Sequence, residues 1–448
     1  MYSVAVVKYE RPFDSLKQAV ELCGGFGDLS VNSKVFIKPN IVVWHEEVNF
    51  PKYGVLTTSR LIEDMVRLLN EQGVTDISVV EGIVEAEKSP KRSTLEIAAK
   101  GLGLDLLRDR YGVKFVDVMK SRFTKILVNG HQILVNADIS EADYVIDMPV
   151  LKTHTQAKVS LGIKNLKGLL NTSSRKFFHN ADREMDLNYQ LAKLPEIIPV
   201  NLTVLDGIYT LEMGPLYTGI AHRSDIIIAS KDLISADKVG AKALGIEPED
   251  VPHIAFCAKA KGRKPDLSDV NIKGEIDVRK VLKPHRWALE QNETGDLPMF
   301  FEKAGIKGIR FPEMDNTLCT YGTHFINYII MGIITAKNKN RTFDDVEILY
   351  GKIQTPTLGH KHTILVGQCQ VKLNSDHPAI NHCVKIRGCP PRKDDFVAAF
   401  EEVGIQLKDD FLEWIKKSPE LHYMKRYEGN PKFDPTFYAI HYNEERSR

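Results

Sequence analysis

The stretch Lys34-Val-Phe-Ile-Lys-Pro-Asn-Ile-Val-Val43 opens the pattern that decides the fold of this chain. It predicts a buried strand whose hydrogen-bonded ladder ends at Pro39, because proline has no N–H to donate. An amphipathic helix over Arg60–Glu71 and a second buried strand over Asp76–Gly82 follow with short connections. Strand, helix and strand in this order are typical of a right-handed crossover in a parallel sheet. We therefore expect an α/β protein with a mostly parallel sheet flanked by helices, and a smaller α/β unit near the C-terminus.

Polar residues follow the predicted strands at the ends where parallel sheets bind their ligands. Lys38 and Asn40 come at the end of the first strand, and Glu81 ends the second. Asp206 stands in the run Asn201–Ile208, which we interpret as a further strand that ends in an acid and a glycine. Each has a plainer alternative, since a lysine can form a surface salt bridge, an asparagine an Asx turn, and a carboxylate can cap the next helix.

The segment Leu151–Leu170 follows another apolar run, Tyr144–Pro149, and is rich in cations that stand between apolar residues. Cations and backbone N–H groups at the end of a strand suit an anionic group such as a carboxylate or a phosphate. A solvated basic loop is the alternative. The predicted catalytic residues are His154, Lys164 and His179, and the predicted ligand-binding residues are Lys38, Asn40, Glu81, Lys152, Asn165 and Asp206.

The composition argues against two classes of partner. Sixty basic residues stand against fifty-nine acidic ones, so no bulk field attracts nucleic acid or an anionic membrane. The first residues, Met1–Lys8, lack the pattern of a signal peptide, and the longest apolar stretch, Phe325–Ala336, is too short to span a bilayer. We expect a cytoplasmic protein whose six cysteines serve metal or redox chemistry, or have no special role, rather than forming disulfides.

Changes in pattern along the chain predict four parts. Residues 1–260 are expected to form an α/β ligand-binding domain, within which Asn129-Gly130 joins the two strands of a β-hairpin. Residues 261–310, rich in Lys, Pro and Gly, are expected to be a linker or an irregular segment. A small α/β domain with cysteines at strand ends is expected over 311–408, and a helix with an aromatic, charged tail over 409–448.

Several motifs in one order resemble the domain of unknown function 362 family. They are Lys38-Pro-Asn40, Leu151-Lys-Thr-His154, Gly162-Ile-Lys-Asn-Leu-Lys-Gly168, the later His179, and Asp206-Gly207 followed by Gly214-Pro215. The resemblance covers roughly residues 34–250. It implies a fold and the position of a site more than an activity, because the name of the family carries no reaction.

The order of His154, Lys164 and His179 also resembles the cofactor-binding segment of the nickel-pincer lactate racemases. This resemblance implies that Lys164 tethers a nickel-pincer nucleotide, and that the two histidines serve as base or metal ligand. The chain departs from that family where Ile163-Lys-Asn165 stands in place of a Gly-rich lysine loop. A metal-pincer racemase or epimerase of a hydroxy acid is therefore an alternative function.

The C-terminal part is similar to the cluster-binding domain of hydrogenase small subunits and of the related subunit of respiratory complex I. The similarity lies in Leu318-Cys-Thr-Tyr-Gly322, Val366-Gly-Gln-Cys369 and Gly388-Cys-Pro-Pro-Arg392. It implies a four-iron (4Fe–4S) cluster on Cys319, Cys369 and Cys389, since such a cluster needs thiolates from separate loops. Gly322 stands where that family has its second cysteine. The fourth iron is then open or is held by Cys383, His324 or His377, and a retained fold without a cluster is the alternative.

Together these features predict an iron–sulfur-dependent oxidoreductase or lyase-type enzyme of anaerobic metabolism. It would act on an anionic organic small molecule, with a redox partner such as ferredoxin, and His154 or His179 would donate or accept a proton. A non-catalytic electron carrier, or an assembly factor that docks through its aromatic tail, is the remaining alternative.

Overall fold

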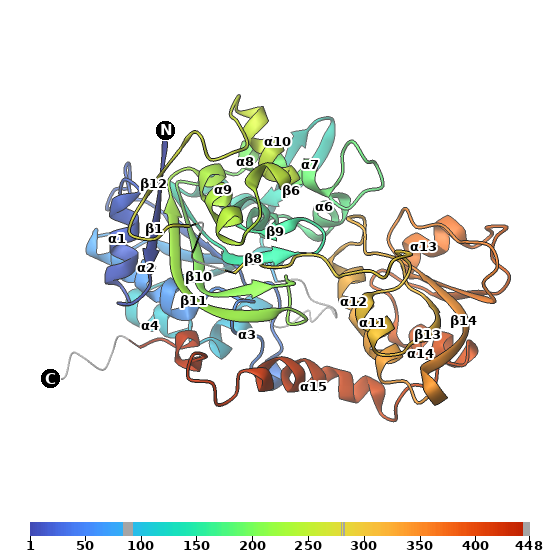
Figure 1. The fold of residues 1–448 in the computed structure, drawn as a ribbon. Coiled ribbons are helices and arrows are strands. Elements are labelled where there is room, and N and C mark those ends of the chain that lie inside the picture. Colours follow the sequence, from blue (N-terminus) through green and yellow to red (C-terminus); the bar gives the residue numbers. More distant parts are fainter. Residues whose placement is uncertain (84–92, 279, 281–282, 442–448) are drawn as a thin grey trace. The chain divides into compact units, whose positions relative to one another are not determined.

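The computed structural model describes residues 1–83, 93–278, 280 and 283–441, and it divides into two compact units (Figure 1). Unit 1 contains residues 1–175, 188–287 and the described part of 420–448. Unit 2 contains residues 176–187 and 288–419. Each unit is therefore assembled from stretches that are separate in the sequence.

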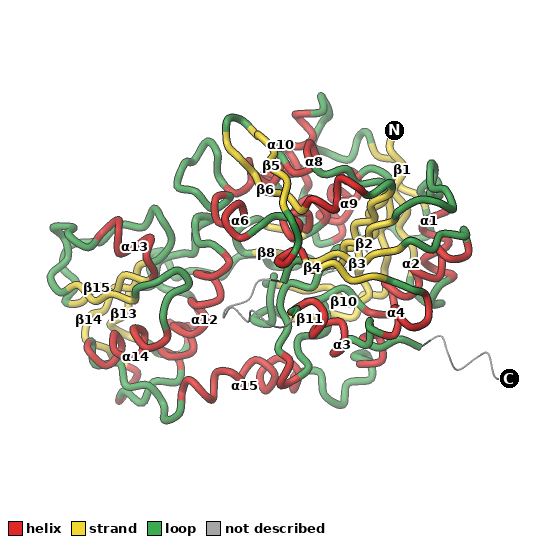
Figure 2. Tube along the Cα trace, turned by 180° about the vertical axis from the view of Figure 1, so that it is seen from behind, coloured by secondary structure: helices red, strands yellow, loops and turns green. Residues whose placement is uncertain are grey.

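Unit 1 is built on a ten-stranded sheet, whose strands are yellow in Figure 2. Eight strands follow the order β12-β1-β11-β10-β7-β2-β3-β4, and β8 pairs with both β10 and β9. Neighbours from β10 to β4 are parallel, whereas β11 runs antiparallel to β1 and to β10. The strands are β1 (Tyr2–Lys8), β2 (Val35–Pro39), β3 (Ile77–Glu81), β4 (Lys114–Asp117), β7 (Tyr144–Met148), β8 (Val150–His154), β9 (Lys158–Ser160), β10 (Leu202–Glu212), β11 (Ile220–Ser230) and β12 (Val270–Lys273). The predicted fold class, with a mostly parallel sheet, is confirmed.

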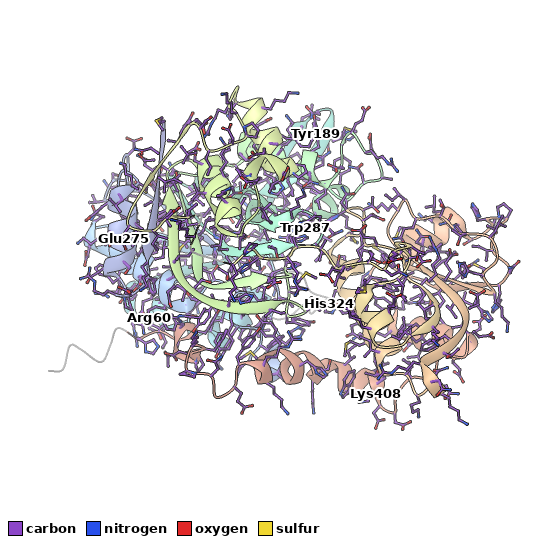
Figure 3. The ribbon with its side chains drawn as sticks, in the orientation of Figure 1. Arg60, Tyr189, Glu275, Trp287, His324 and Lys408 are labelled. Carbon is purple, nitrogen blue, oxygen red and sulfur yellow. The ribbon has the colours of Figure 1, made fainter. Side chains whose placement is uncertain are left out.

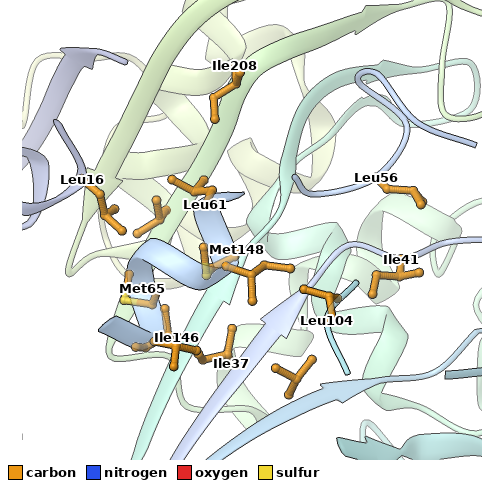
Figure 4. Close-up of a cluster of buried hydrophobic side chains, with 14 of the residues drawn as sticks. Leu16, Ile37, Ile41, Leu56, Leu61, Met65, Leu104, Ile146, Met148 and Ile208 are labelled. Atoms are coloured by element: carbon orange, nitrogen blue, oxygen red, sulfur yellow. The ribbon is translucent and has the colours of Figure 1, made fainter. Parts of the chain in front are cut away.

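Helices cover both faces of this sheet. The helices α1 (Asp14–Leu22) and α2 (Ser59–Glu71) share one apolar core with the strands. Figure 4 shows part of that core, including Leu16, Ile37, Met65, Ile146 and Ile208. On the other face α9 (Leu233–Ala243) packs so close to β10 that a Cβ at Gly240 would stand 2.6 Å from the Leu205 side chain. Burial on both faces explains why these strands read as continuous apolar runs.

The remaining elements of unit 1 include the predicted hairpin. Its strands β5 (Phe123–Val128) and β6 (His131–Asn136) pair antiparallel, and Asn129 and Gly130 both have positive φ, as a two-residue hairpin turn requires. This prediction is confirmed. The other helices are α3 (Thr94–Gly101), α4 (Leu106–Tyr111), α5 (Gly162–Asn165), α6 (Thr172–Phe177), α7 (Leu187–Ala192), α8 (Leu194–Ile197) and α10 (Pro252–Ala260), of which α6 and α7 run across the boundary between the units.

Unit 2 is built on a four-stranded parallel sheet in the order β13-β14-β15-β16. Its strands are β13 (Lys307–Arg310), β14 (Thr342–Leu349), β15 (His362–Val366) and β16 (Cys383–Ile386). Its helices are α11 (Met299–Lys303), α12 (Thr320–Ile334), α13 (Gly367–Asn374), α14 (Lys393–Glu402) and most of α15 (Phe411–Tyr423). The apolar face of α12 packs with Phe396 and Phe400 of α14 in a core separate from that of unit 1. The expected smaller α/β unit is present.

The boundaries of the units differ from those expected at 260, 311 and 409. Residues 261–310, expected to be a linker, give β12 to the sheet of unit 1 and β13 to the sheet of unit 2, with the division after Trp287. The tail is also divided, because residues from 420 onward belong to unit 1. The last part of the expected tail, 442–448, lies outside the described residues.

Two further expectations concern the end of the strand at Asp206 and the length of the apolar helices. Asp206 does not end a strand, because β10 continues through a register shift between Gly207 and Tyr209 to Glu212. That interpretation of the acid and glycine as a strand end was wrong, since a β-bulge can absorb a glycine within a strand. In the described part of the chain, no helix combines the length and the apolar character needed to cross a membrane.

Candidate functional site

A buried ion pair lies at the ends of β2 and β3 in unit 1. The Lys38 ammonium donates to Glu81 Oε2 at 2.9 Å, and both side chains are almost completely buried. Lys38 also donates to the carbonyl oxygen of Pro39 at 2.6 Å and to Asn165 Oδ1 at 3.3 Å. Glu81 in turn accepts the backbone N–H of Ile41 at 2.7 Å. Each hydrogen-bonding group of this pair is therefore met by the protein, which is the condition under which a buried charge is tolerated.

Asn165, the last residue of α5, joins this ion pair to two other elements. Its Oδ1 accepts from Asn40 Nδ2 at 2.9 Å, and its Nδ2 donates to Asp147 Oδ1 at 2.8 Å. The same Nδ2 lies 3.2 Å from the carbonyl oxygen of Lys38. An amide at this position connects β2, β7 and α5, because only an amide offers a donor and an acceptor on one planar group.

Lys152, in β8, extends the same network. Its ammonium donates to Asn40 Oδ1 and to the carbonyl oxygen of Val55, both at 2.7 Å, and to the carbonyl oxygen of Pro215 at 3.2 Å. Burial lowers the pKa of Lys152 well below its ordinary value, and the nearby Lys164 ammonium adds to this effect. The structure thus brings together five of the six predicted ligand-binding residues, and it satisfies them with one another.

The sixth, Asp206, lies apart from these residues in the hydrogen-bonding pattern. Its Oδ2 accepts the backbone N–H of Thr58 at 2.7 Å and its Oδ1 that of Ile208 at 3.1 Å. Burial raises the pKa of Asp206 to about 6. Asp206 therefore holds the start of α2 against β10.

Two buried carboxyl groups flank Gly162, and the sequence did not single them out. Asp237 accepts the backbone N–H groups of Gly162 and Ile163 at 2.7 and 2.8 Å, and burial raises its pKa to about 7. Burial also raises the pKa of Asp147 well above its ordinary value, and its Oδ2 meets no hydrogen-bond partner among the described residues. A Cβ at Gly162 would stand 2.9 Å from both carboxyl groups, so only glycine fits there. The sequence did offer one sign of a buried carboxyl group, because Asp147 is an acid within the otherwise apolar strand β7.

Lys164 differs from its neighbours in this network. Its side chain is half-buried on α5, and among the described residues it has no hydrogen-bond or ion-pair partner. Burial lowers the pKa of its amine to about 8. His154 is buried at the end of β8, where its Nδ1 accepts the backbone N–H of Gln156 at 3.1 Å.

His179, the third predicted catalytic residue, belongs to unit 2. Its ring Nδ1 lies 2.8 Å from the carbonyl oxygen of Asn316, so Nδ1 carries the proton in that hydrogen bond. The Lys352 ammonium donates to the carbonyl oxygens of His179 and of Lys176, which fixes segment 176–187 to the body of unit 2. The three predicted catalytic residues are therefore divided between the two units.

Three cysteines of unit 2 come together at the carboxyl edge of its sheet. Cys319 caps the start of α12, Cys369 lies in the first turn of α13, and Cys389 follows β16. The loops of the latter two adjoin, since Gln368 N–H donates to the Gly388 carbonyl oxygen at 2.9 Å. All three cysteines lie close enough to the Lys352 amine to influence its pKa. Burial lowers the pKa of Lys352, and negative charge on the three sulfur atoms raises it, so the two effects oppose one another.

A second lysine reaches the same thiols. The Lys176 ammonium lies 3.2 Å from Cys389 Sγ and 4.8 Å from the centre of the Tyr321 ring. Neither Lys176 nor Lys352 was singled out from the sequence. Lys176 lies in the basic run before His179, and its contact with Cys389 joins residues more than 200 positions apart, so no local pattern could reveal it.

The residues expected to complete the set of cluster ligands lie in different places. Cys383 is the first residue of β16, whereas Cys389 follows the last, so the two stand at opposite ends of that strand. His324 lies on α12 five positions after Cys319, and Figure 3 labels it on unit 2. His377 follows α13, and its Nδ1 accepts the backbone N–H of Ala379 at 3.2 Å. Over the described ranges, no three histidine, cysteine, aspartate or glutamate side chains are placed to share one metal ion.

Residues 35–242 match the family described as "Domain of unknown function (DUF362)". This match confirms the resemblance stated from the motifs, over nearly the same residues. The matched segment carries the whole polar network around Asn165, and also Lys176 and His179 of unit 2. Residues 288–419, which hold the three cysteines, lie outside it.

Two individual proteins are similar to the chain. A thylakoid-associated protein of Synechocystis sp. is 25% identical over 284 residues, which cover 62% of this chain and 83% of that protein. Among solved structures, the lactate racemase apoprotein from Thermoanaerobacterium thermosaccharolyticum aligns with a TM-score of 0.32 and 14% identity, over 57% of this chain and 55% of that one. The chain thus spans little more than half the length of the solved protein. Likenesses of this size do not assign an activity.

Proposed function

We propose that the protein is an iron–sulfur enzyme that acts on an anionic organic small molecule by reduction or rearrangement. In this proposal Cys319, Cys369 and Cys389 hold a four-iron cluster in unit 2. The observation that carries it is the convergence of three thiols from separate loops beside two lysine ammonium groups. In a four-iron cluster each thiolate binds a different iron, so the ligands need not be placed to share one ion.

The surroundings of the three thiols fit an anionic group. Cys319 is the N-cap residue of α12 and Cys369 lies in the first turn of α13, where the positive end of the helix dipole favours an anionic group, although burial raises the pKa of the Cys369 thiol. The ammonium groups of Lys176 and Lys352 offset further negative charge. When bound, the cluster would supply electrons or, at an iron without a cysteine ligand, a position for the substrate.

The chain's own residues have separate tasks in this proposal. Lys176 and Lys352 attract the anionic substrate toward the thiols by charge. His179, whose Nδ1–H donates to the Asn316 carbonyl oxygen, would be the group that donates or accepts a proton. A reduced carrier of the ferredoxin class would deliver the electrons.

The deciding experiment is the iron and acid-labile sulfide content of full-length protein purified without oxygen. We expect about four irons and four sulfides per chain, with broad thiolate-to-iron absorption. Cys389→Ala should lose most of the iron. Cys383→Ala is the matched control and should keep it, because Cys383 lies at the other end of β16.

Two outcomes would count against this proposal. If folded wild-type protein contains no iron after reconstitution, unit 2 has kept a fold without a cluster. If Cys383→Ala loses as much iron as Cys389→Ala, the assignment of the three converging thiols is wrong.

A second candidate is a metal-pincer racemase or epimerase of a hydroxy acid, with a nickel-pincer nucleotide on Lys164. The observation that favours it is a half-buried amine with no partner among the described residues. Stoichiometric nickel and a mass increment on Lys164 would support this candidate. An unmodified Lys164 in active protein would remove it.

A further inference from the structure

The Lys164 amine has the features of a nucleophile. The residue as a whole is half-buried, and no acceptor among the described residues holds the protons of the amine. Burial lowers its pKa from 10.5 to about 8. At pH 7 about 10% of such an amine is neutral, against roughly 0.03% of an ordinary lysine, which is a difference of about 300-fold.

Burial is what lowers the pKa of the Lys164 amine. The neighbouring Lys152 side chain is held in place by its three acceptors, and the pKa of Lys152 is lowered in turn, by burial first and by Lys164 second. Lys164 stands on the short helix α5, whose start is fixed by Asp237 through two backbone N–H groups. The amine is therefore presented by a rigid element.

A buried base lies within electrostatic range of this amine. His253 is completely buried on α10, and its pKa is lowered to about 3, by burial first and by Lys164 second, so the ring is neutral. Its Nδ1 lies 3.2 Å from Asn188 Oδ1, and because that oxygen can only accept, Nδ1 carries the proton. The lone pair is then on Nε2, which has no hydrogen-bond partner among the described residues. An unmatched acceptor of this kind is costly without a ligand that donates to it.

We propose that Lys164 is a carbonyl-binding site, at which a small aldehyde or keto acid forms an imine with the amine while His253 Nε2 accepts a hydrogen bond from the hydroxyl of the intermediate. The nitrogen lone pair attacks the carbonyl carbon, a C–N bond forms, and the carbonyl oxygen becomes a hydroxyl. The two hydrogens of the amine leave with that oxygen as water, which gives a C=N bond. The reaction needs no oxidant or reductant, and it does not depend on the proposed cluster.

The test is reductive trapping on the full-length protein with glyoxylate and cyanoborohydride, followed by peptide mapping. Cyanoborohydride reduces the imine, so each reacting lysine gains a carboxymethyl group. We expect Lys164 to be labelled on the order of 100-fold faster than Lys158 at pH 7, with a rate that rises through a midpoint near pH 8. Lys158 is a suitable internal reference, because it is also half-buried and its ammonium lies over the Trp287 ring at 5.3 Å.

Variants and a second reagent make the result decisive. Lys164→Arg should abolish the fast labelling, and Lys158→Arg should leave it unchanged. His253→Gln should slow the labelling of Lys164 several-fold while the labelling of Lys158 stays the same. The proposal is overturned if Lys164 reacts with glyoxylate no faster than Lys158 in the wild-type protein. It is also overturned if acetic anhydride labels Lys164 rapidly and glyoxylate does not, because the amine would then be reactive without binding a carbonyl compound.

Discussion

The polar network of unit 1 and the thiol cluster of unit 2 both lie at the carboxyl edge of parallel strands, yet they differ in how their groups are satisfied. Lys38, Glu81 and Asn165 meet one another and the backbone at hydrogen-bonding distance. The thiols of unit 2 have two ammonium groups beside them, and Cys369 and Cys389 are exposed. A group that is fully matched within the protein holds the fold together, whereas a buried polar group without a partner calls for a separate explanation, such as a catalytic role or a bound molecule. Within the described part of unit 1, Lys164, the His253 ring and Asp147 are among the groups of the second kind.

The largest effect that we predict concerns the C-terminal tail, which the sequence offered as a docking surface. In the structure Tyr423, Tyr427 and Tyr438 are buried in the core of unit 1. A chain that ends at residue 419 should therefore lose folded unit 1, because truncating even one buried aromatic side chain costs about 3–5 kcal/mol. Near-UV circular dichroism and limited proteolysis would show the loss. Leu127→Ala, at an exposed side chain, is the control and should be neutral.

The opposite result would revive the tail as a partner-binding element. If the shortened chain stays fully folded and loses only its ability to form a complex, the aromatic contacts within unit 1 contribute little. The comparison of the two regions would then have to include the tail as a third, unmatched surface.

The buried ion pair of unit 1 should show the next largest effect. Glu81→Ala leaves the Lys38 ammonium buried without its carboxylate, and we expect a loss of about 3–5 kcal/mol in the free energy of unfolding. Glu96→Ala removes the partner of Arg108 in an exposed pair, and should cost less than about 1 kcal/mol. Urea unfolding of both variants gives the two values. If Glu81→Ala and Glu96→Ala lose the same free energy of unfolding, the buried Lys38–Glu81 pair stabilises the fold no more than an exposed ion pair does.

The sequence predicted the first crossover of the fold well, because its signals are local. Val35–Pro39 and Ile77–Glu81 are short, mostly apolar runs that are completely buried, and Thr58 caps the helix between them. The extent of β10 was missed, since Asp206-Gly207 has the composition of a strand end and a bulge has the same composition. Local composition cannot distinguish the two.

The sequence identified individual residues of the candidate site but not the contacts between them. The sequence picked out Lys38, Glu81 and Asn165, but it could not show that they bind one another, because this depends on three separate elements meeting. It also grouped His179 with Lys164, and it could not show that segment 176–187 packs in unit 2. Contacts between distant segments follow from tertiary packing, which no spacing along the chain encodes.

A smaller effect concerns the reduction potential of the proposed cluster in unit 2. If the proposed cluster is present, Lys176→Met removes a positive charge 3.2 Å from Cys389 Sγ and should shift the midpoint potential to a more negative value. Iron content should stay near that of the wild type. Lys361→Met is the control, because Lys361 pairs with Asp344 on the exposed surface of unit 2. An unchanged potential in an iron-loaded Lys176→Met protein would mean that this ammonium does not act on the cluster.

The smallest effect concerns Asp147, whose Oδ2 has no hydrogen-bond partner among the described residues. Burial raises the pKa of Asp147 well above its ordinary value of 3.8. The folded state therefore keeps a proton that the unfolded chain releases above about pH 4, so the free energy of unfolding falls as the pH rises. Asparagine has the shape of the protonated acid and can still accept from Asn165. Asp147→Asn should match the wild type near pH 4 and become the more stable protein toward pH 8.

Urea unfolding at several pH values measures this difference directly. The gain from Asp147→Asn should grow with pH, whereas Asp109→Asn, at an exposed position on α4, should give a difference that does not change with pH. A constant difference for Asp147→Asn would mean that the carboxyl group ionises equally in the folded and unfolded chains. The unmatched oxygen would then be an ionised acceptor that needs a donor, and Asp147 would join Lys164 among the groups of unit 1 that await a ligand.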